Sequence, residues 1–425
     1  MKKYSSSILV LFIAAAFMCG FVGCEKLKIS NLQANYHLKK ANRLYADESY
    51  KKATEEYQLA LELNPNLKAA YLYLGTSYSS LYRPMKTGER NKEYGDKAAD
   101  YLLKAFEAFP ENENIVYALG DIYDKMSQFE EAEKYYLKIL ERAKENAEKT
   151  GEYDPKPYYI LADFYSKYNR SDEAKAMYEE RISLEPNAPD GYLYYASYAS
   201  DRRQWDLSIE NHEKRILAIY DPDTLNLQLE IEKMKKDMEK IEAIEKNMDT
   251  IKKHRSLDKA EKTRLLDEAR QRLEEFQPLE ELTKLVPEKE KQVEENLKAK
   301  DEKIDALDDE KKKELTEAYY TLGVVCWNKS FQSPPHIMGP QERIQAVDKG
   351  LEACNATLKL EPEHYNAYAF IGLLWRQKIV AEPLKNDEYM ANWKKAYDKS
   401  KSLRERIVRR EKLKEQLEQM GKAEN

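Results

Sequence analysis

The sequence predicts an all-α protein, and three observations support this fold class. Lys, Glu, Leu and Ala dominate the 425 residues, while glycine is scarce, with 13 in total and none between Gly191 and Gly323. Alternating strand patterns and hairpin signals are nearly absent. Apolar and small residues instead recur at helical spacing and are followed by prolines, which end helices. We therefore expect helices along the chain and no β-sheet.

The N-terminus has the layout of an export signal. Lys2 and Lys3 precede an uncharged apolar run over residues 8–22, which is shorter than the roughly 20 apolar residues that a membrane-spanning helix needs. A positive segment, an apolar segment and a small residue before the cleavage point are typical of a secretory signal. This pattern predicts that residues 1–23 are a signal peptide.

The residues around Cys24 indicate the fate of this segment. Phe21-Val22-Gly23-Cys24 resembles a bacterial lipobox, although Phe21 stands where leucine is usual. The resemblance implies cleavage after Gly23, acylation of Cys24 and a lipid-anchored protein that faces the periplasm, since several acyl chains hold a protein firmly on a membrane. Glu25, in place of an aspartate, favours the outer membrane over the inner one. The alternative is an ordinary signal peptide with an incidental cysteine, or an uncleaved short anchor.

Small residues, aromatic residues and a closing proline recur together at four places. The segments are "YKKATEEYQLALELNPN" (50–66), "DKAADYLLKAFEAFPEN" (96–112), "SDEAKAMYEERISLEPN" (171–187) and "DKGLEACNATLKLEPEH" (348–364). Each comes after a stretch with a Leu/Tyr–Gly/Ala pair and a later aromatic, as in Leu74-Gly75 with Tyr78. Small residues allow two helices to approach closely, and aromatic residues fill the remaining gaps.

These residues resemble the tetratricopeptide repeat, a helix–turn–helix unit of about 34 residues. One unit cannot bury its own apolar face, so the resemblance implies a stacked α-solenoid. The alternative is an unrelated amphipathic bundle. We align five repeats at 34–67, 68–112, 113–142, 155–188 and 189–222. A sixth repeat, interrupted by a loop, covers 316–363, and a degenerate seventh begins near residue 365.

The predicted domain order is based on this alignment. It comprises a signal peptide (1–23), a tether (24–33), the repeat array (34–222), a charged helical insertion (223–313), repeats six and seven (314–388) and a C-terminal capping helix (389–425).

The insertion carries apolar residues at coiled-coil spacing, beginning at Leu227 and Ile231. Ser256 is the expected N-cap of its second helix, and Pro278 and Pro287 are expected to break the helical segment after that helix. Two interpretations of the insertion are open: a helical hairpin packed on itself, or a docking arm for a partner or a second copy of the chain.

The basic cluster Arg404–Lys414 is interleaved with glutamates, which favours a solvated capping helix over nucleic-acid binding.

The sequence contains no pattern typical of a catalytic or metal centre. None of its five histidines stands at metal-ligand spacing, and it has no glycine-rich phosphate loop and no G-x-S-x-G. We therefore expect no enzyme, metal, cofactor or small-molecule substrate. Without Lys2 and Lys3 the net charge falls from −6 to −8, which opposes general affinity for nucleic acid.

The resemblance also implies a binding surface on the first helix of each repeat. We expect it to be rich in tyrosine and acidic in its middle, and to take a segment with basic and apolar side chains. The residues chosen for this surface are Asn42, Thr76, Tyr117, Asp121, Asp124, Tyr159 and Asp163, with Asn35, Leu38, Leu72, Ser197 and Asp201 as further members. A lysine clamp for C-terminal carboxylates is not expected, because Leu38 stands where a lysine is needed.

Cys326 and Cys354 fall on the two facing helices of the sixth repeat. The sequence leaves two possibilities open, a disulfide between them or a pair of buried free thiols, since the bond depends on a Cα separation that sequence does not give.

Taken together, the sequence predicts a lipid-anchored periplasmic scaffold that binds a protein partner in envelope or outer-membrane complex assembly. The alternative is an accessory subunit that binds peptidoglycan, an exported polymer or a transporter.

Overall fold

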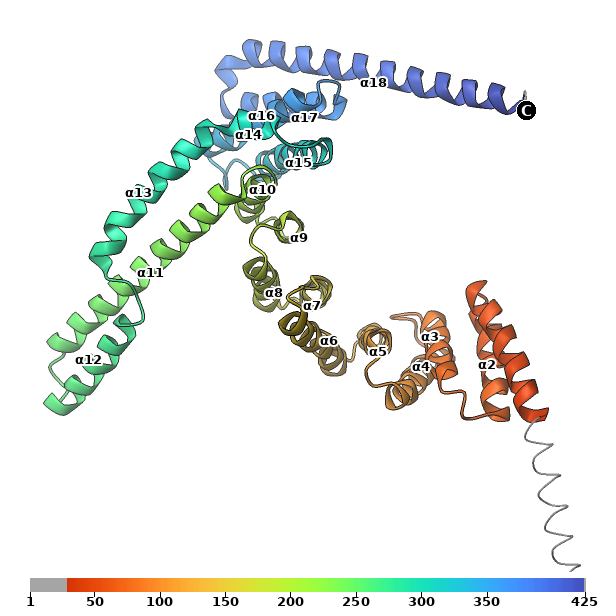
Figure 1. Ribbon diagram of the computed structural model, residues 1–425. Helices are drawn as coiled ribbons and strands as arrows, with labels where there is room; N and C mark the ends of the chain where they lie inside the picture. The colour runs from red at the N-terminus through yellow and green to blue at the C-terminus, as the bar shows by residue number, and fades with distance from the viewer. Residues whose placement is uncertain (1–28, 424–425) are drawn as a thin grey trace, which may run out of the picture. The chain divides into compact units, whose positions relative to one another are not determined.

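The computed structural model describes residues 29–423, and these form helices joined by short loops, with no strand among them (Figure 1). The prediction of an all-α solenoid of tetratricopeptide-type helix pairs is confirmed. The described chain forms two compact units, with the division between Met177 and Tyr178. Cys24 and the predicted signal peptide lie outside the described residues.

In the first unit each helix between residues 50 and 167 packs against the next along the chain. Its helices are residues 29–46, α2 (Tyr50–Leu63), α3 (Ala69–Leu81), α4 (Glu89–Ala108), α5 (Glu113–Lys125), α6 (Phe129–Thr150), α7 (Lys156–Lys167) and the start of α8 (Ser171–Leu184). Prolines limit several helices as expected: α2 ends two residues before Pro65, α4 two residues before Pro110, and α8 two residues before Pro186.

The tether was predicted to extend to residue 33, and this was wrong. The chain is already helical at residue 29, because Ser30 donates to the Leu63 carbonyl (2.6 Å) and Ala34 is fully buried.

Glycine permits a close contact between two helices of this unit. A Cβ atom on Gly75 of α3 would lie 2.7 Å from Cγ and 3.0 Å from the backbone nitrogen of Leu102 on α4. Leu102, Ala98 and Ala105 of α4 are fully buried. The backbone of α3 therefore lies directly on the side chains of α4, as the repeat pattern predicted.

The second unit continues with the end of α8, and its stacked helices enclose two mainly aliphatic clusters of buried residues. They are α9 (Pro189–Asp201), α10 (Trp205–Tyr220), α15 (Asp309–Gln332), α16 (Pro340–Leu360), α17 (Tyr365–Ala381), the short 3₁₀ helix η1 (Pro383–Lys385) and α18 (Asn386–Ala423). Helix α10 packs against α15 although 88 residues separate Tyr220 from Asp309. Helix stacking thus resumes directly after the insertion.

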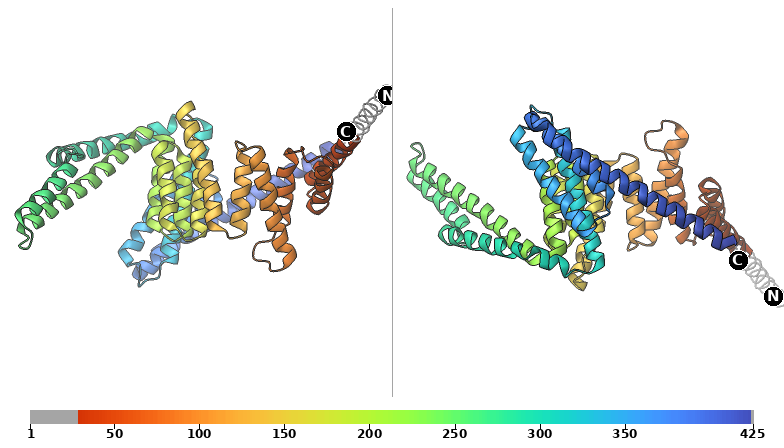
Figure 2. Two further views of the ribbon diagram at one scale, coloured as in Figure 1. Left: turned by 90° about the horizontal axis from the view of Figure 1, so that it is seen from below. Right: turned by 90° about the horizontal axis from the view of Figure 1, so that it is seen from above.

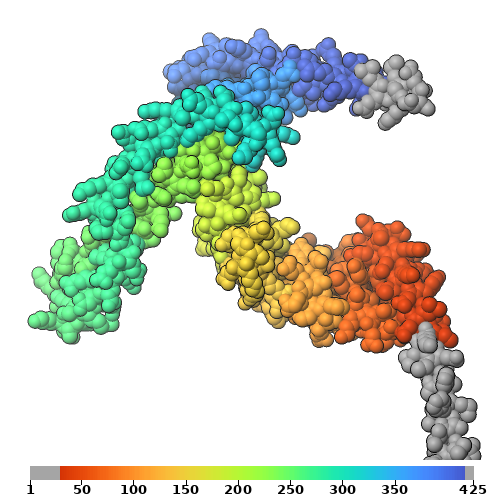
Figure 3. Space-filling model, in the orientation of Figure 1, coloured from red at the N-terminus to blue at the C-terminus, as the bar shows by residue number. Residues whose placement is uncertain are grey.

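The insertion itself is an arm made of α11 (Pro222–Lys253), α12 (Lys259–Leu273) and α13 (Leu279–Lys298), with α14 (Lys300–Asp305) leading back to α15. Figures 2 and 3 show the arm extending away from the stacked helices of its unit. Helix α11 packs against both α12 and α13, and Ile231, Val286 and Val293 are buried between α11 and α13. The arm therefore buries its own apolar residues, as expected of a helical hairpin packed on itself.

Two details of the arm differ from the sequence prediction. The N-cap of α12 is Asp258 and not Ser256, because the Asp258 carboxylate accepts a hydrogen bond from the Glu261 backbone N–H at 2.8 Å. Pro287 does not break the helix but lies inside α13. We attribute its tolerance to the buried Leu282, Val286 and Val293 around it, whose packing offsets the lost backbone hydrogen bond.

Helix α18 covers α17 at the C-terminal end. Tyr389, Ala396 and Leu403 are buried on its inner side, while Arg406 and Arg410 form ion pairs with Glu363 at 2.8 and 3.1 Å. Two members of the basic cluster therefore have an acidic partner within the protein.

Candidate partner-binding surface

Helices α5 and α7 of the first unit carry five of the seven residues chosen first for the partner-binding surface. Tyr117, Asp121 and Asp124 lie four and three residues apart on α5 and so share one face. Tyr159 and Asp163 lie four residues apart on α7. Burial raises the pKa of the Tyr117 hydroxyl, and the carboxylates of Asp121, Asp124 and Asp163 raise it further. Both helices thus contribute acidic groups around one tyrosine. We call Tyr117, Asp121, Asp124 and Asp163 together the Tyr117 surface.

The carboxylates of this surface differ in how far they are neutralised. Asp121 pairs with Lys125 at 2.7 Å. Asp124 Oδ1 accepts from Lys167 Nζ at 2.8 Å and from the Tyr168 hydroxyl at 2.9 Å, with only 18% of its side chain exposed. Asp163 is exposed. A basic partner would therefore meet Asp163 first, while Asp121 and Asp124 are partly occupied.

Aromatic packing supports Tyr117 from below. A Cβ on Gly120 would lie 2.5 Å from the Tyr136 ring, so the glycine allows α6 to bring that ring against α5. The Tyr117 and Tyr136 ring centroids are 6.3 Å apart, and Tyr136 in turn contacts Phe164 of α7 edge to face at 5.3 Å. Tyr117 keeps 47% of its surface exposed on this base. A fixed, half-exposed tyrosine is a typical anchor for a protein partner.

Asn42 and Thr76 are on other helices, and the Asn42 amide oxygen and the Thr76 hydroxyl already have partners. Asn42 Oδ1, on the helix over 29–46, accepts from the buried Tyr57 hydroxyl at 2.7 Å. Thr76 donates to the Leu72 carbonyl of its own helix at 3.0 Å. Of the further members, Asn35, Ser197 and Asp201 are exposed, whereas Leu38 and Leu72 are half-buried.

Sequence reasoning missed three residues that shape the Tyr117 surface. Lys125 lies four residues after Asp121 and pairs with it, which is a signal that sequence offers. Lys167 lies four residues after Asp163 but pairs with Asp124 of α5, which sequence spacing does not show. Tyr168 and its bond to Asp124, 44 residues away, carry no such local signal.

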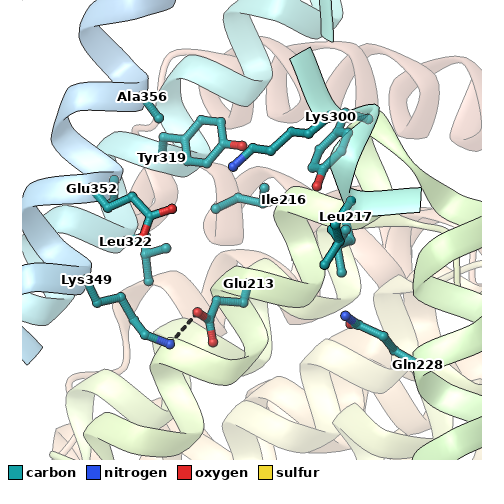
Figure 4. A pocket seen from close by; sticks show the side chains of 13 residues that line it. Glu213, Ile216, Leu217, Gln228, Lys300, Tyr319, Leu322, Lys349, Glu352 and Ala356 are labelled. Atoms are coloured by element: carbon teal, nitrogen blue, oxygen red, sulfur yellow. Dashed lines mark hydrogen bonds and ion pairs between the residues drawn. The ribbon is translucent and has the colours of Figure 1, made fainter. Parts of the chain in front are cut away.

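The second unit contains a cavity of about 400 Å³ at the base of the arm, between α10, α15, α16 and the returning chain (Figure 4). Glu213 and Lys349 form an ion pair across it, and Lys300 Nζ lies 5.2 Å from the Tyr319 ring centroid. The Tyr319 hydroxyl is buried and has no hydrogen-bond partner among the described residues. Burial raises its pKa, so this phenol is neutral and is a potential donor.

Cys326 of α15 and Cys354 of α16 face each other's helix, as expected. Sγ of Cys354 lies 2.5 Å from the place that a Cβ of Gly323 would take, and Cβ of Cys326 lies 2.9 Å from the corresponding position of Gly350. Both are free, buried thiols in the structure, without the bridge that the sequence left open. Burial raises the pKa of each thiol to about 12, so little reactive thiolate forms at neutral pH.

Among residues 29–416, whose side chains the structure describes, no three His, Cys, Asp or Glu residues come together as metal ligands. No helix in this range is long and apolar enough to cross a membrane.

The fold and these helix pairs define a protein with tetratricopeptide-type repeats. The family model described as tetratricopeptide repeat matches residues 114–146 and 155–188, which confirms the third and fourth predicted repeats. The Tyr117 surface lies within these two repeats. Such repeats indicate a protein-binding scaffold.

Three of the solved structures that are similar to part of the chain illustrate the extent of the likeness. YrrB, described as a TPR protein with an unusual peptide-binding site, is 22% identical, with 46% of this chain and 90% of that chain covered and a TM-score of 0.30. MamA is 17% identical, with 42% and 93% covered and a TM-score of 0.31. Pseudomonas aeruginosa PilF is 15% identical, with 47% and 84% covered and a TM-score of 0.30. No match was found among curated proteins.

Proposed function

We propose that this chain is a lipid-anchored scaffold of the bacterial cell envelope that faces the periplasm and binds a protein partner during envelope or outer-membrane complex assembly. Acyl chains on Cys24 would hold it, with the outer membrane favoured over the inner one. The partner-binding part of this proposal rests above all on the Tyr117 surface, where a half-exposed tyrosine on an aromatic base stands beside three carboxylates from two helices.

The chemistry of this surface defines the partner. An apolar side chain can pack on the exposed Tyr117 ring, and a lysine or arginine next to it can pair with Asp163. The Lys167 side chain is half exposed, so it can turn away and leave the Asp124 carboxylate to a basic group of the partner. We therefore propose a partner segment with basic and apolar residues side by side.

Partner binding is tested by affinity capture from detergent-solubilised envelopes. Tyr117→Ala combined with Asp163→Lys should reduce recovery of the partner at least about tenfold, because aromatic anchors commonly contribute 2 kcal/mol or more. Tyr153→Ala is the matched control, since Tyr153 is a loop tyrosine of similar exposure, 41%, outside the surface. Equal capture by the double variant and the wild type would refute the role of the Tyr117 surface. Retention on isolated cell-wall sacculi, with no protein captured, would favour the peptidoglycan alternative.

The lipid anchor is tested at Cys24. Cys24→Ser should move the protein into the soluble periplasmic fraction or leave an unprocessed precursor, because serine lacks the thiol to which the diacylglycerol is attached. Fractionation followed by mass spectrometry of the N-terminus measures both outcomes. Normal cleavage after Gly23 together with unchanged membrane retention would exclude acylation at this cysteine.

A further inference from the structure

The helix over residues 29–46 is held in place by its inner face. Ala34 and Ala41 are fully buried against the rest of the unit. His37 and Lys40 both contact the Glu56 carboxylate of α2, each at 2.7 Å. These contacts fix the rotation of the helix about its axis, so the opposite face is directed to the outside.

That outer face carries an apolar stripe. Ile29, Leu32 and Tyr36 are 59%, 74% and 64% exposed, and their spacing of three and four residues places them in one row. Lys39 and Arg43 continue the same row at the same spacing, and both are exposed. We call these five residues the outer stripe of the first helix.

The charge of this helix differs from that of the chain. Residues 29–46 contain no Asp or Glu, whereas the whole chain has 77 acidic against 71 basic residues. The outer face of a terminal repeat is normally polar, since it has no neighbour to cover it. An exposed row of large apolar and basic residues without acidic ones is instead typical of helices that lie in the membrane interface.

We propose that the outer stripe rests on a membrane surface containing anionic lipids, with Ile29, Leu32 and Tyr36 in the interface and Lys39 and Arg43 on the headgroups. Tyrosine suits this position because its ring is apolar and its hydroxyl remains hydrated. A basic residue near an anionic surface contributes about 1 kcal/mol. The first helix thus orients the chain on the membrane.

The position of the stripe in the chain supports this occupant. Only the four residues 25–28 lie between Cys24 and Ile29, and the five Cα-to-Cα steps from Cys24 to Ile29 span at most about 18 Å. If Cys24 is acylated, the stripe cannot move far from the bilayer, and this restriction depends on the proposed anchor. A second copy of the chain is less suitable, because three apolar side chains offer well under the about 800 Å² per partner that a stable interface buries.

The test uses residues 24–425 with Cys24→Ser, which retain every described helix and lack acyl chains. Flotation with phosphatidylethanolamine vesicles, with or without phosphatidylglycerol, should show binding only when phosphatidylglycerol is present. Leu32→Ser with Tyr36→Ser should lower the bound fraction about five- to tenfold, since both side chains leave the interface. Binding of the parent chain should weaken as the salt concentration rises, and Lys39→Glu with Arg43→Glu should abolish binding to the phosphatidylglycerol vesicles, because the anionic headgroups then repel this end of the stripe. Met85→Ser, at a fully exposed methionine in the loop after α3, should change nothing.

Absence of binding by the parent chain, or equal binding by the Leu32/Tyr36 variant, would overturn the proposal. A dimer in sedimentation velocity that the same variant dissociates would also overturn it, and would assign the stripe to a second copy. Because the tested chain cannot be acylated and the Tyr117 surface is unaltered, failure here is separate from failure of the anchor or of partner capture.

Discussion

Gly75→Leu is expected to destabilise the first unit by about 3 kcal/mol, at the upper end of what overpacked cores show. The Cβ alone would lie 2.7 Å from Leu102 Cγ and 3.0 Å from its backbone nitrogen, so α3 and α4 must move apart. Thermal unfolding should show a midpoint lower by several degrees. Gly339→Leu is the control, because no atom lies within 4 Å of a Cβ at Gly339 and its φ is negative.

A double-mutant cycle identifies the atoms responsible. Leu102→Ala leaves a cavity when made alone, but it removes the Cγ that meets a new Cβ at position 75. Gly75→Ala should therefore cost less in the Leu102→Ala background than in the wild type. Additive costs, or an unchanged midpoint in Gly75→Leu, would show that α3 and α4 do not pack through this glycine.

The second large effect is a loss of stability in mild acid caused by His212. This side chain is 1% exposed on α10, and burial together with the nearby Arg215 lowers its pKa from 6.5 to about 4. Since the folded state binds the proton less well than the unfolded state, stability is complete above pH 6.5 and falls as the pH drops towards 4. At pH 5 the loss attributable to His212 is about 2 kcal/mol.

Urea unfolding at pH 7.5 and at pH 5 measures this loss. His212→Gln cannot titrate, so the drop in free energy of unfolding between the two pH values should be about 2 kcal/mol smaller in the variant. Titration of the carboxylates is common to both proteins and cancels in the comparison. The same drop in both would mean that His212 is protonated in the folded state or exposed to solvent.

Much of the helix packing was predictable because it depends on local pattern. Gly75 was assigned to a helix contact from its place after Leu74, and the structure puts it on Leu102. Prolines two residues past α2 and α4 ended those helices as expected. Pro287 was misjudged, because the burial that offsets its missing N–H comes from α11, which is distant in sequence.

The Tyr117 surface was predictable only in part, for the same reason. Tyr117, Asp121 and Asp124 share a helical face, and sequence spacing shows that directly. The pairing of Asp124 with Lys167 joins residues 43 positions apart and depends on how α5 and α7 pack. Likewise, the spacing of Ile29, Leu32 and Tyr36 is visible in the sequence, but only the fixed inner contacts of Ala34 and Ala41 show that this row faces outward.

Partner binding at the Tyr117 surface is tested most directly by photocrosslinking in cells. A photoreactive amino acid is introduced at position 117 and, in a separate variant, at position 153. Both are exposed tyrosines of the first unit, at 47% and 41%, but only Tyr117 belongs to the proposed surface. We expect a discrete crosslinked protein from position 117 that disappears when Asp163→Lys is added, and none from position 153. The absence of a crosslink at position 117, or an identical product from both positions that persists with Asp163→Lys, would contradict partner binding at the Tyr117 surface.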